Sequence, residues 1–379
     1  MSFGLIYGCG PKIFGIAILD EIVAIYALFS RLLTGKLLII NHHWAERALI
    51  IYFLLISLTG FIHTQNINIF RYFVIVIFLL FYRPRPAFSI GSMVAGAKAF
   101  LVTYLIITFF GHIFDLPVAF WQESLWVGTA YAAVFSLFSA WLCILFAKNV
   151  ANKSLIVSIY LFGAMLADSR LQILLAGALV PAFFSNVQRD FGGRINSKKI
   201  VSSVTLFIVT SLLVAFAVEF SKNADGNVFQ SAESTILDLA INDDNERDAD
   251  RKDSIKASLN WAEDHPFKLI TGTGILAHQL ELKKYYPESN DGVVRPTGFP
   301  AMIVDGGIIF LFLILLNAFV TFMRIMRARI PTLPKLSIIL VLALTLVSIV
   351  IVNPFDAILF WLIIMPSGVL PFALQEWAH

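Results

Sequence analysis

Four arginines are the residues of this sequence with the strongest case for chemistry. Arg170 follows Asp168 at the start of an apolar run in ADSRLQILLAGAL, and Arg295 precedes another such run in DGVVRPTGFPAMIV. Arg71 begins a third apolar run, and Arg251 lies in the mixed-charge stretch DADRKDSIKASLNW. Guanidinium groups keep their charge at any relevant pH and form paired hydrogen bonds to phosphate oxygens. Several of them around one cavity would suit a pyrophosphate.

Each arginine also has a purely structural explanation. Arg170 could pair with Asp168 or snorkel to the membrane surface, although membrane-flanking basic residues favour the cytoplasmic side. Arg71 could be an interfacial anchor, Arg295 a solvated loop residue, and Arg251 part of a solvated helix face. A charge at the mouth of a membrane span is costly unless it faces water, a partner or a ligand. This cost makes Arg170 the first candidate for a functional role.

Signatures of other site chemistries are missing from the sequence. There is no HExxH helix, no GxxxxGK[ST] nucleotide loop and no GxSxG nucleophile turn. Cys9 and Cys143 both lie in apolar surroundings and indicate neither a disulfide framework nor a cysteine metal site. His265 precedes a proline at a predicted helix end, and we expect His278 at the surface of an outer loop. We therefore expect no metal and no cofactor.

The elements that position these residues are predicted to be membrane helices. Of 379 residues, 58% are hydrophobic and 14% are charged, against roughly 25% charged in soluble domains. A net charge of +3, spread over short clusters, gives no argument for nucleic acid as a partner. We predict an all-α, polytopic transmembrane helix bundle of about 11 to 12 spans. The expected spans lie near 13–33, 47–63, 68–82, 90–112, 124–147, 153–168, 170–187, 200–220, 299–323, 336–352 and 356–374.

The distribution of basic residues predicts the orientation of the bundle. Fifteen Lys and Arg residues collect in alternate connections, whereas the opposite short connections hold only Arg71 and Arg170. The positive-inside rule places the basic connections in the cytoplasm and the long segment 221–298 on the other side. We thus expect an N-terminal bundle of about eight spans over 1–220, an extracytoplasmic loop over 221–298 and about three C-terminal spans over 299–379.

The outer loop carries its own helical pattern. Ile255, Leu259 and Ala262 recur at helical spacing after an acidic first turn, and Pro266 is expected to end this helix. Residues 276–286 have an apolar Leu/Tyr face, which predicts a second short helix on the membrane surface. We therefore expect a partly folded loop over the membrane.

Three segments, in this order, resemble the Wzy-type O-antigen and exopolysaccharide polymerases and the related O-antigen ligases. They are SRLQIL, DRKDSIKASLNWAEDHPFKLITGTG and RPTGFPAMIVDGGIIFLFLI. The likeness covers roughly residues 165 to 325. The residues in motif positions are Arg170 with Leu174, Arg251 followed by Trp261, His265, Pro266, Gly272 and Gly274, and Arg295 with Gly306, which have ten residues between them.

The resemblance implies a metal-independent glycosyltransferase on the periplasmic side of the bacterial inner membrane. It would transfer a growing glycan from undecaprenyl pyrophosphate to another lipid-linked repeat unit, so that donor and acceptor are both lipid-linked. Arg170, Arg251 and Arg295 would hold the pyrophosphate and neutralise its developing charge. Membrane lipid and a chain-length regulator protein are the further candidate partners. The other residues expected to contact substrate are Arg71, Asp168, His278, Glu281 and Asp291.

The general base is left open by the sequence. A base would take the proton of the acceptor hydroxyl, and the candidate carboxylates are Asp168, Glu281, Asp291 and Asp305.

Three alternative functions remain. Ligases of the family carry a His-Asn pair where this chain has Arg295, Pro296 and Thr297, which favours a polymerase over a ligase acting on a lipid A core sugar. Interrupted spans at matched positions in two halves would indicate a transporter of the lipid-linked unit. The sequence has no such symmetry. A non-catalytic membrane scaffold would not explain arginines gathered on the outer side.

Overall fold

The protein is helical wherever its structure is described. The computed structural model describes residues 25–26, 28–29, 32–33, 43–81, 90–113, 127–147, 149–166, 176–190, 246–285, 298–351 and 358–371. Within these ranges every regular element is a helix and there is no strand, which confirms the all-α prediction. By length and composition two helices could cross a membrane, Trp44–Thr64 and Gly298–Arg327, and several shorter apolar helices accompany them.

The described helices follow one another along the chain as α-helices with short 3-10 turns. They are α3 (Trp44–Thr64), η2 (Ile67–Ile69), α4 (Phe70–Phe81), α6 (Ile90–Ile113), α7 (Val127–Leu145), α8 (Val150–Leu166), η5 (Ala176–Ala178), α10 (Leu179–Asp190), α13 (Glu246–Asp264), α14 (Pro266–Thr271), α15 (His278–Glu281), η6 (Leu282–Tyr285), α16 (Gly298–Arg327), α17 (Thr332–Ile351) and α18 (Ile358–Ile364).

Most of the expected spans coincide with observed helices to within a few residues. The agreement holds for α3, α4, α6, α7, α8 and α17. The span expected over 356–374 is wrong as one helix, because α18 ends at Ile364 and the chain turns before Gly368. The span expected over 299–323 is present, but a break at Gly307 divides it. The expected span 200–220, and most of 13–33, lie outside the described residues.

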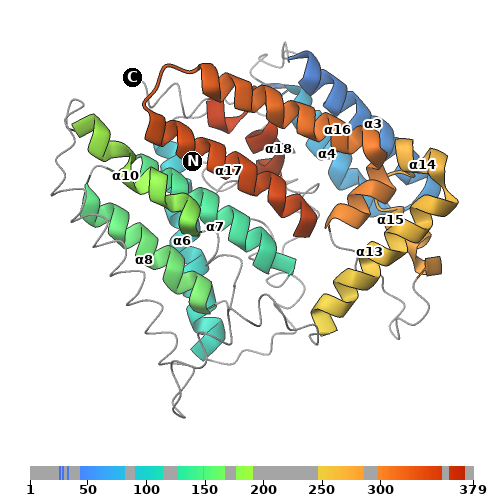
Figure 1. The fold of residues 1–379 in the computed structure, drawn as a ribbon, viewed down its shortest axis with the longest axis horizontal. Helices are drawn as coiled ribbons and strands as arrows, with labels where there is room; N and C mark the ends of the chain where they lie inside the picture. Colours follow the sequence, from blue (N-terminus) through green and yellow to red (C-terminus); the bar gives the residue numbers. More distant parts are fainter. Residues whose placement is uncertain are drawn as a thin grey trace.

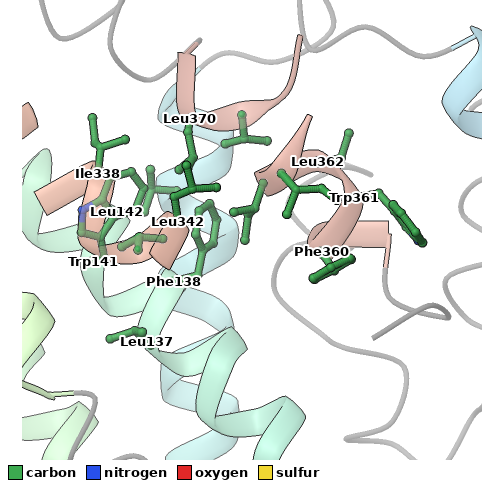
Figure 2. Packing of buried hydrophobic residues seen from close by; sticks show 14 of the residues in the cluster. Leu137, Phe138, Trp141, Leu142, Ile338, Leu342, Phe360, Trp361, Leu362 and Leu370 are labelled. Atoms are coloured by element: carbon green, nitrogen blue, oxygen red, sulfur yellow. The ribbon is translucent and has the colours of Figure 1, made fainter. Parts of the chain in front are cut away.

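Two groups of helices pack together in the bundle. In Figure 1, α3 and α16 lie side by side, and α13, α14 and α15 gather at one end of this pair. The second group contains α6, α7, α8 and α10, and α17 contacts both α16 and this group. Figure 2 shows the core between them, where Trp141 of α7 lies near Ile338 and Leu342 of α17. This arrangement leaves one end of the α3 and α16 pair to be covered by residues 246–285.

The start of α3 is fixed at the end of the bundle away from that segment. Glu46 is fully buried and accepts a hydrogen bond from the backbone N–H of His43 at 3.1 Å, which closes the first turn. Its other carboxylate oxygen accepts from the backbone N–H of Ser367 in the turn after α18. The side-chain amide of Asn317 in α16 donates to the carbonyl of Ala45 at 2.9 Å. These contacts fix the position of α3 along the axis of α16.

Residues 246–285, called the lid below, lie on the opposite end of the bundle and form one long helix, two short helices and a 3-10 turn. The helix expected around Ile255 is present as α13, and Pro266 begins the next helix, α14. The apolar residues whose spacing indicated this helix do not form its buried face, because Ile255 and Leu259 are exposed while Ala257 and Trp261 are buried. The reason is tertiary: Trp261 packs in a small core with Leu282 and with Val304 of α16, and one large aromatic ring outweighs two aliphatic side chains.

Candidate functional site

The site begins at a break in α16. Gly307 has φ 68° and ψ −176°, so the helix stops and restarts within the sequence VDGG. Carbonyls in the last turn before a break lack intrahelical partners. Those of Val304 and Asp305 accept hydrogen bonds from the backbone N–H groups of Thr273 and Gly274, both at 2.9 Å. The break in α16 therefore provides the docking surface for the lid.

Residues 271–275, called the glycine segment below, fit between α3 and α16 only because side chains are missing there. A Cβ on Gly274 would lie 2.2 Å from the backbone nitrogen of Gly60 in α3, and one on Gly272 would lie 2.2 Å from the carbonyl oxygen of Asp305. The φ angles of +110° and +74° at these two positions also favour glycine. The order Gly-Thr-Gly is thus explained by backbone contact with two helices.

His278 and Asp305 form a buried pair beside the glycine segment. The Nδ1 atom of His278 lies 2.7 Å from Oδ2 of Asp305. The expectation that His278 lies at the surface is wrong, because it is 5% exposed and Asp305 is 0% exposed. The physical reason is the break at Gly307: it leaves the Asp305 carboxylate facing the lid, where His278 can satisfy it.

The backbone of the lid completes the hydrogen bonding of Asp305. Its carboxylate also accepts from the N–H of Leu276 at 2.9 Å and from the N–H of His278 at 2.8 Å. Leu276 has a φ of +65°, a conformation that costs a bulky residue about 1–2 kcal/mol. Strain of this kind persists only where the surroundings impose it, and here it accompanies the N–H bond to Asp305. The pair is therefore held rigidly by three donors.

This geometry gives the two side chains of the pair different chemical roles. Two backbone N–H groups are directed at the Asp305 carboxylate, which makes it an acceptor and assigns the Nδ1 proton to His278. Nε2 of His278 has no hydrogen-bond partner among the described residues, and it is the ring atom left to take up a proton. Asp305, a candidate base in the sequence, has no exposed surface through which to meet a hydroxyl group. A neutral imidazole whose Nδ1–H is held by a carboxylate can act as a base through Nε2.

Glu281 joins the lid to the end of α3. Its Oε2 accepts from Nε1 of Trp261 at 3.1 Å, and its Oε1 lies 3.2 Å from Nζ of Lys268 and 3.3 Å from Nε2 of His63. Burial by itself raises the pKa of this carboxyl group. The hydrogen bonds from Trp261 and Lys268, with the charges of Lys268 and His63, outweigh burial and bring the pKa below its usual value of 4.5.

The lowered pKa of Glu281 predicts how stability depends on pH. A carboxyl group with a folded pKa below its unfolded pKa stabilises the fold above the unfolded value, and this contribution is lost as pH falls through the folded value. We expect Glu281→Gln to lower the melting temperature near neutral pH, and we expect the difference from wild type to shrink as pH falls below about 4.5. Thermal melts between pH 7 and pH 3 measure this. Glu263→Gln, at an exposed position of α13, is the matched control; a constant difference for Glu281→Gln would contradict the assignment.

The structure brings together only part of the set predicted from the sequence. His278 and Glu281 lie in the site, and Arg71 is half-buried in the first turn of α4. Arg251 belongs to α13, and nothing is described of its side chain. Four further predicted residues lie outside the described ranges: Arg170, Asp168, Arg295 and Asp291. The proposed meeting of the three arginines therefore stays a prediction.

Several site residues had a weak signal or none in the sequence. Asp305 is an ionisable residue inside an apolar run, which marks a functional position in a membrane helix by default. Tyr52 gave no signal, yet its hydroxyl oxygen lies 2.7 Å from the carbonyl oxygen of Thr271 and 3.1 Å from that of Gly306. His63 likewise gave no signal in the sequence. Comparisons of the chain with protein-family models and with curated proteins find no match.

Proposed function

We propose that this protein is a polymerase-type membrane glycosyltransferase acting on a polyprenyl-pyrophosphate-linked glycan. The observation that carries the proposal is the His278–Asp305 pair, at 2.7 Å, set where the glycine segment meets the break in α16. Both of these segments belong to the resemblance, and they meet although about thirty residues separate them in the chain. A buried, oriented histidine at that contact supports an enzyme more than a scaffold or a transporter.

In the proposed reaction, the hydroxyl oxygen of the acceptor sugar attacks the anomeric carbon of the donor glycan. The bond between that carbon and the pyrophosphate oxygen breaks, and polyprenyl pyrophosphate leaves with the electron pair. Nε2 of His278 takes the hydroxyl proton, and Asp305 holds the resulting imidazolium in place. Arg170, Arg251 and Arg295 are proposed to bind the leaving pyrophosphate. The setting that we propose is the bacterial inner membrane, with a multi-pass fold and the lid on the periplasmic side.

The alternative within the same family is a ligase, which would use a lipid A core sugar as acceptor. The two functions differ in the acceptor: a polymerase uses a second lipid-linked repeat unit, and a ligase uses a lipid A core sugar. We favour the polymerase because Arg295 and Gly306 match the pattern associated with polymerases, with Arg295 where ligases carry a histidine.

The test is transfer by the purified protein in proteoliposomes that contain lipid-linked repeat units as the only glycan. We expect glycans of two or more repeats from the wild type, and a rate lower by about 10²- to 10⁴-fold in His278→Ala. Added imidazole should restore part of that rate. Gln279→Ala, an exposed neighbour on the same short helix, is the control.

The outcomes separate the parts of this proposal. A wild type that lengthens glycan only when lipid A core is supplied would show a ligase. If the wild type polymerises and His278→Ala keeps the full rate, the polymerase assignment stands. His278 is then not the base.

A further inference from the structure

The two long apolar helices present matching exposed stripes. The exposed apolar residues include Ile51, Leu55, Leu58 and Ile62 on α3, and Ile308, Phe312, Leu315 and Phe319 on α16. Both sets follow the spacing i, i+4, i+7, i+11, so each lies on one face of its helix. Faces of this length and composition are typical of helices that contact lipid.

The glycine segment docks along the second half of α3, before its last turn, where His63 meets Glu281. The N–H of Ile275 donates to the carbonyl of Ile56 at 2.9 Å, Tyr52 contacts Thr271, and Gly274 packs on Gly60. At 1.5 Å per residue, Tyr52 lies about 12 Å and Gly60 about 24 Å along a helix of about 31 Å. If α3 crosses the bilayer, the glycine segment lies within the hydrocarbon region, whose thickness is about 30 Å.

The backbone N–H groups of this segment all have protein acceptors, as a segment inside lipid requires. Every N–H from residue 272 to residue 278 donates to a protein acceptor: the carbonyls of Lys268, Val304, Asp305, Ile56 and Gly274, and the carboxylate of Asp305 twice. Non-helical backbone occurs at membrane depth only where protein buries it or where it lines a water-filled cavity. A loop in water could have used solvent for several of these bonds.

The short helix before the glycine segment has an apolar exposed side. Phe267 is 85% exposed and Ile270 is 48% exposed, and at spacing i, i+3 they share one side of α14. The charged residue of α14, Lys268, pairs instead with the buried Glu281. The exposed side of the neighbouring α13 differs, because Ile255 and Leu259 alternate there with Lys256, Asn260 and Glu263, as on a helix in water.

We propose that α14 is a re-entrant, lipid-contacting element, with Phe267 and Ile270 inserted into the hydrocarbon of the bilayer beside α3. The outer segment is then divided, since α13 stands in water while α14 and the glycine segment enter the membrane. The burial of these two apolar side chains in lipid anchors the lid next to the His278–Asp305 pair. This inference rests on contacts and exposure and does not depend on the proposed reaction.

Nitroxide labels on the protein in bilayers test the proposal, in a chain with Cys9→Ala and Cys143→Ala. The test positions are Phe267→Cys and Ile270→Cys, the lipid reference is Leu55→Cys on α3, and the water reference is Glu263→Cys on α13. All four side chains are exposed, so each label is accommodated without repacking. Collision rates with molecular oxygen, which enters hydrocarbon, and with a polar nickel chelate, which is excluded from it, give the depth.

We expect the ratio of oxygen to nickel accessibility at positions 267 and 270 to match that at position 55. It should exceed the ratio at position 263 by at least about fivefold, because polar solutes are excluded from hydrocarbon. Ratios at 267 and 270 equal to that at 263 would overturn the proposal. A water-like ratio at position 55 would also overturn it, since α3 would then not cross the membrane.

Discussion

Gly274→Ala is expected to undock the lid from the two long helices. The added Cβ would lie 2.2 to 2.4 Å from backbone atoms of Gly60. No side-chain rotation can relieve this contact, because a Cβ is fixed to its own backbone and its neighbour is backbone too. The left-handed φ of +110° adds a cost of about 1–2 kcal/mol for alanine, and forced backbone displacement adds about 1–3 kcal/mol. We therefore expect a loss of about 2–5 kcal/mol in the free energy that holds the lid closed.

Amide hydrogen exchange over residues 272–278 measures this effect directly. We expect exchange to accelerate by at least about tenfold in Gly274→Ala, because the N–H groups of this stretch lose their acceptors when the lid opens. Gly177→Ala is the matched control, since no atom lies within 4 Å of the added Cβ there. Unchanged protection in Gly274→Ala would mean that the lid does not dock on α3 as described.

Asp305→Ala is expected to have a comparable effect from the other side of the contact. The substitution leaves the N–H groups of Leu276 and His278 and the ring Nδ1 of His278 without their acceptor in a buried site. Each buried donor left without a partner costs about 1–3 kcal/mol. Asp305→Asn should be less harmful, because the amide oxygen can still accept one or two of these bonds.

Thermal melts, combined with nitrogen NMR of the His278 ring, separate the structural and the positioning roles of Asp305. We expect both variants to lower the melting temperature, Ala more than Asn, and to make the two ring tautomers comparably populated. Asp264→Ala is the control: this lid carboxylate accepts from the Tyr285 hydroxyl at an exposed site, where one such contact contributes little. A ring signal unchanged in Asp305→Asn would show that Asp305 does not set the tautomer.

The two expected losses come from one feature, the break in α16. It frees the carbonyls of Val304 and Asp305 for the lid and directs the Asp305 carboxylate toward His278. A continuous helix would have used those carbonyls internally, and the lid would then have docked by side chains alone. The double glycine after Asp305 is therefore as important to the site as the ionisable residues.

Local sequence pattern was sufficient to predict the helices of the bundle and the glycines of the lid. Apolar runs of membrane length, with basic residues between them, predicted α3, α6, α7 and α17 closely, because lipid and backbone hydrogen bonding leave few alternatives to a helix. Pro266 marked a helix boundary for the same local reason, since proline fits the first turn of a helix and not its interior. The sequence also indicated His278 and Glu281 as candidate contacts for a ligand, and that role stays a prediction.

Only the tertiary structure determined which of those residues face one another. The buried face of α13 follows Trp261 and not Ile255 or Leu259, because α16 provides a packing partner for the indole ring. His278 lies inside the protein and not at its surface, because the buried carboxylate of Asp305, 27 residues away in the chain, pairs with its ring and with its backbone N–H. Spacing along one segment carries no information about a partner that arrives from another, and burial of a charge is decided by that partner.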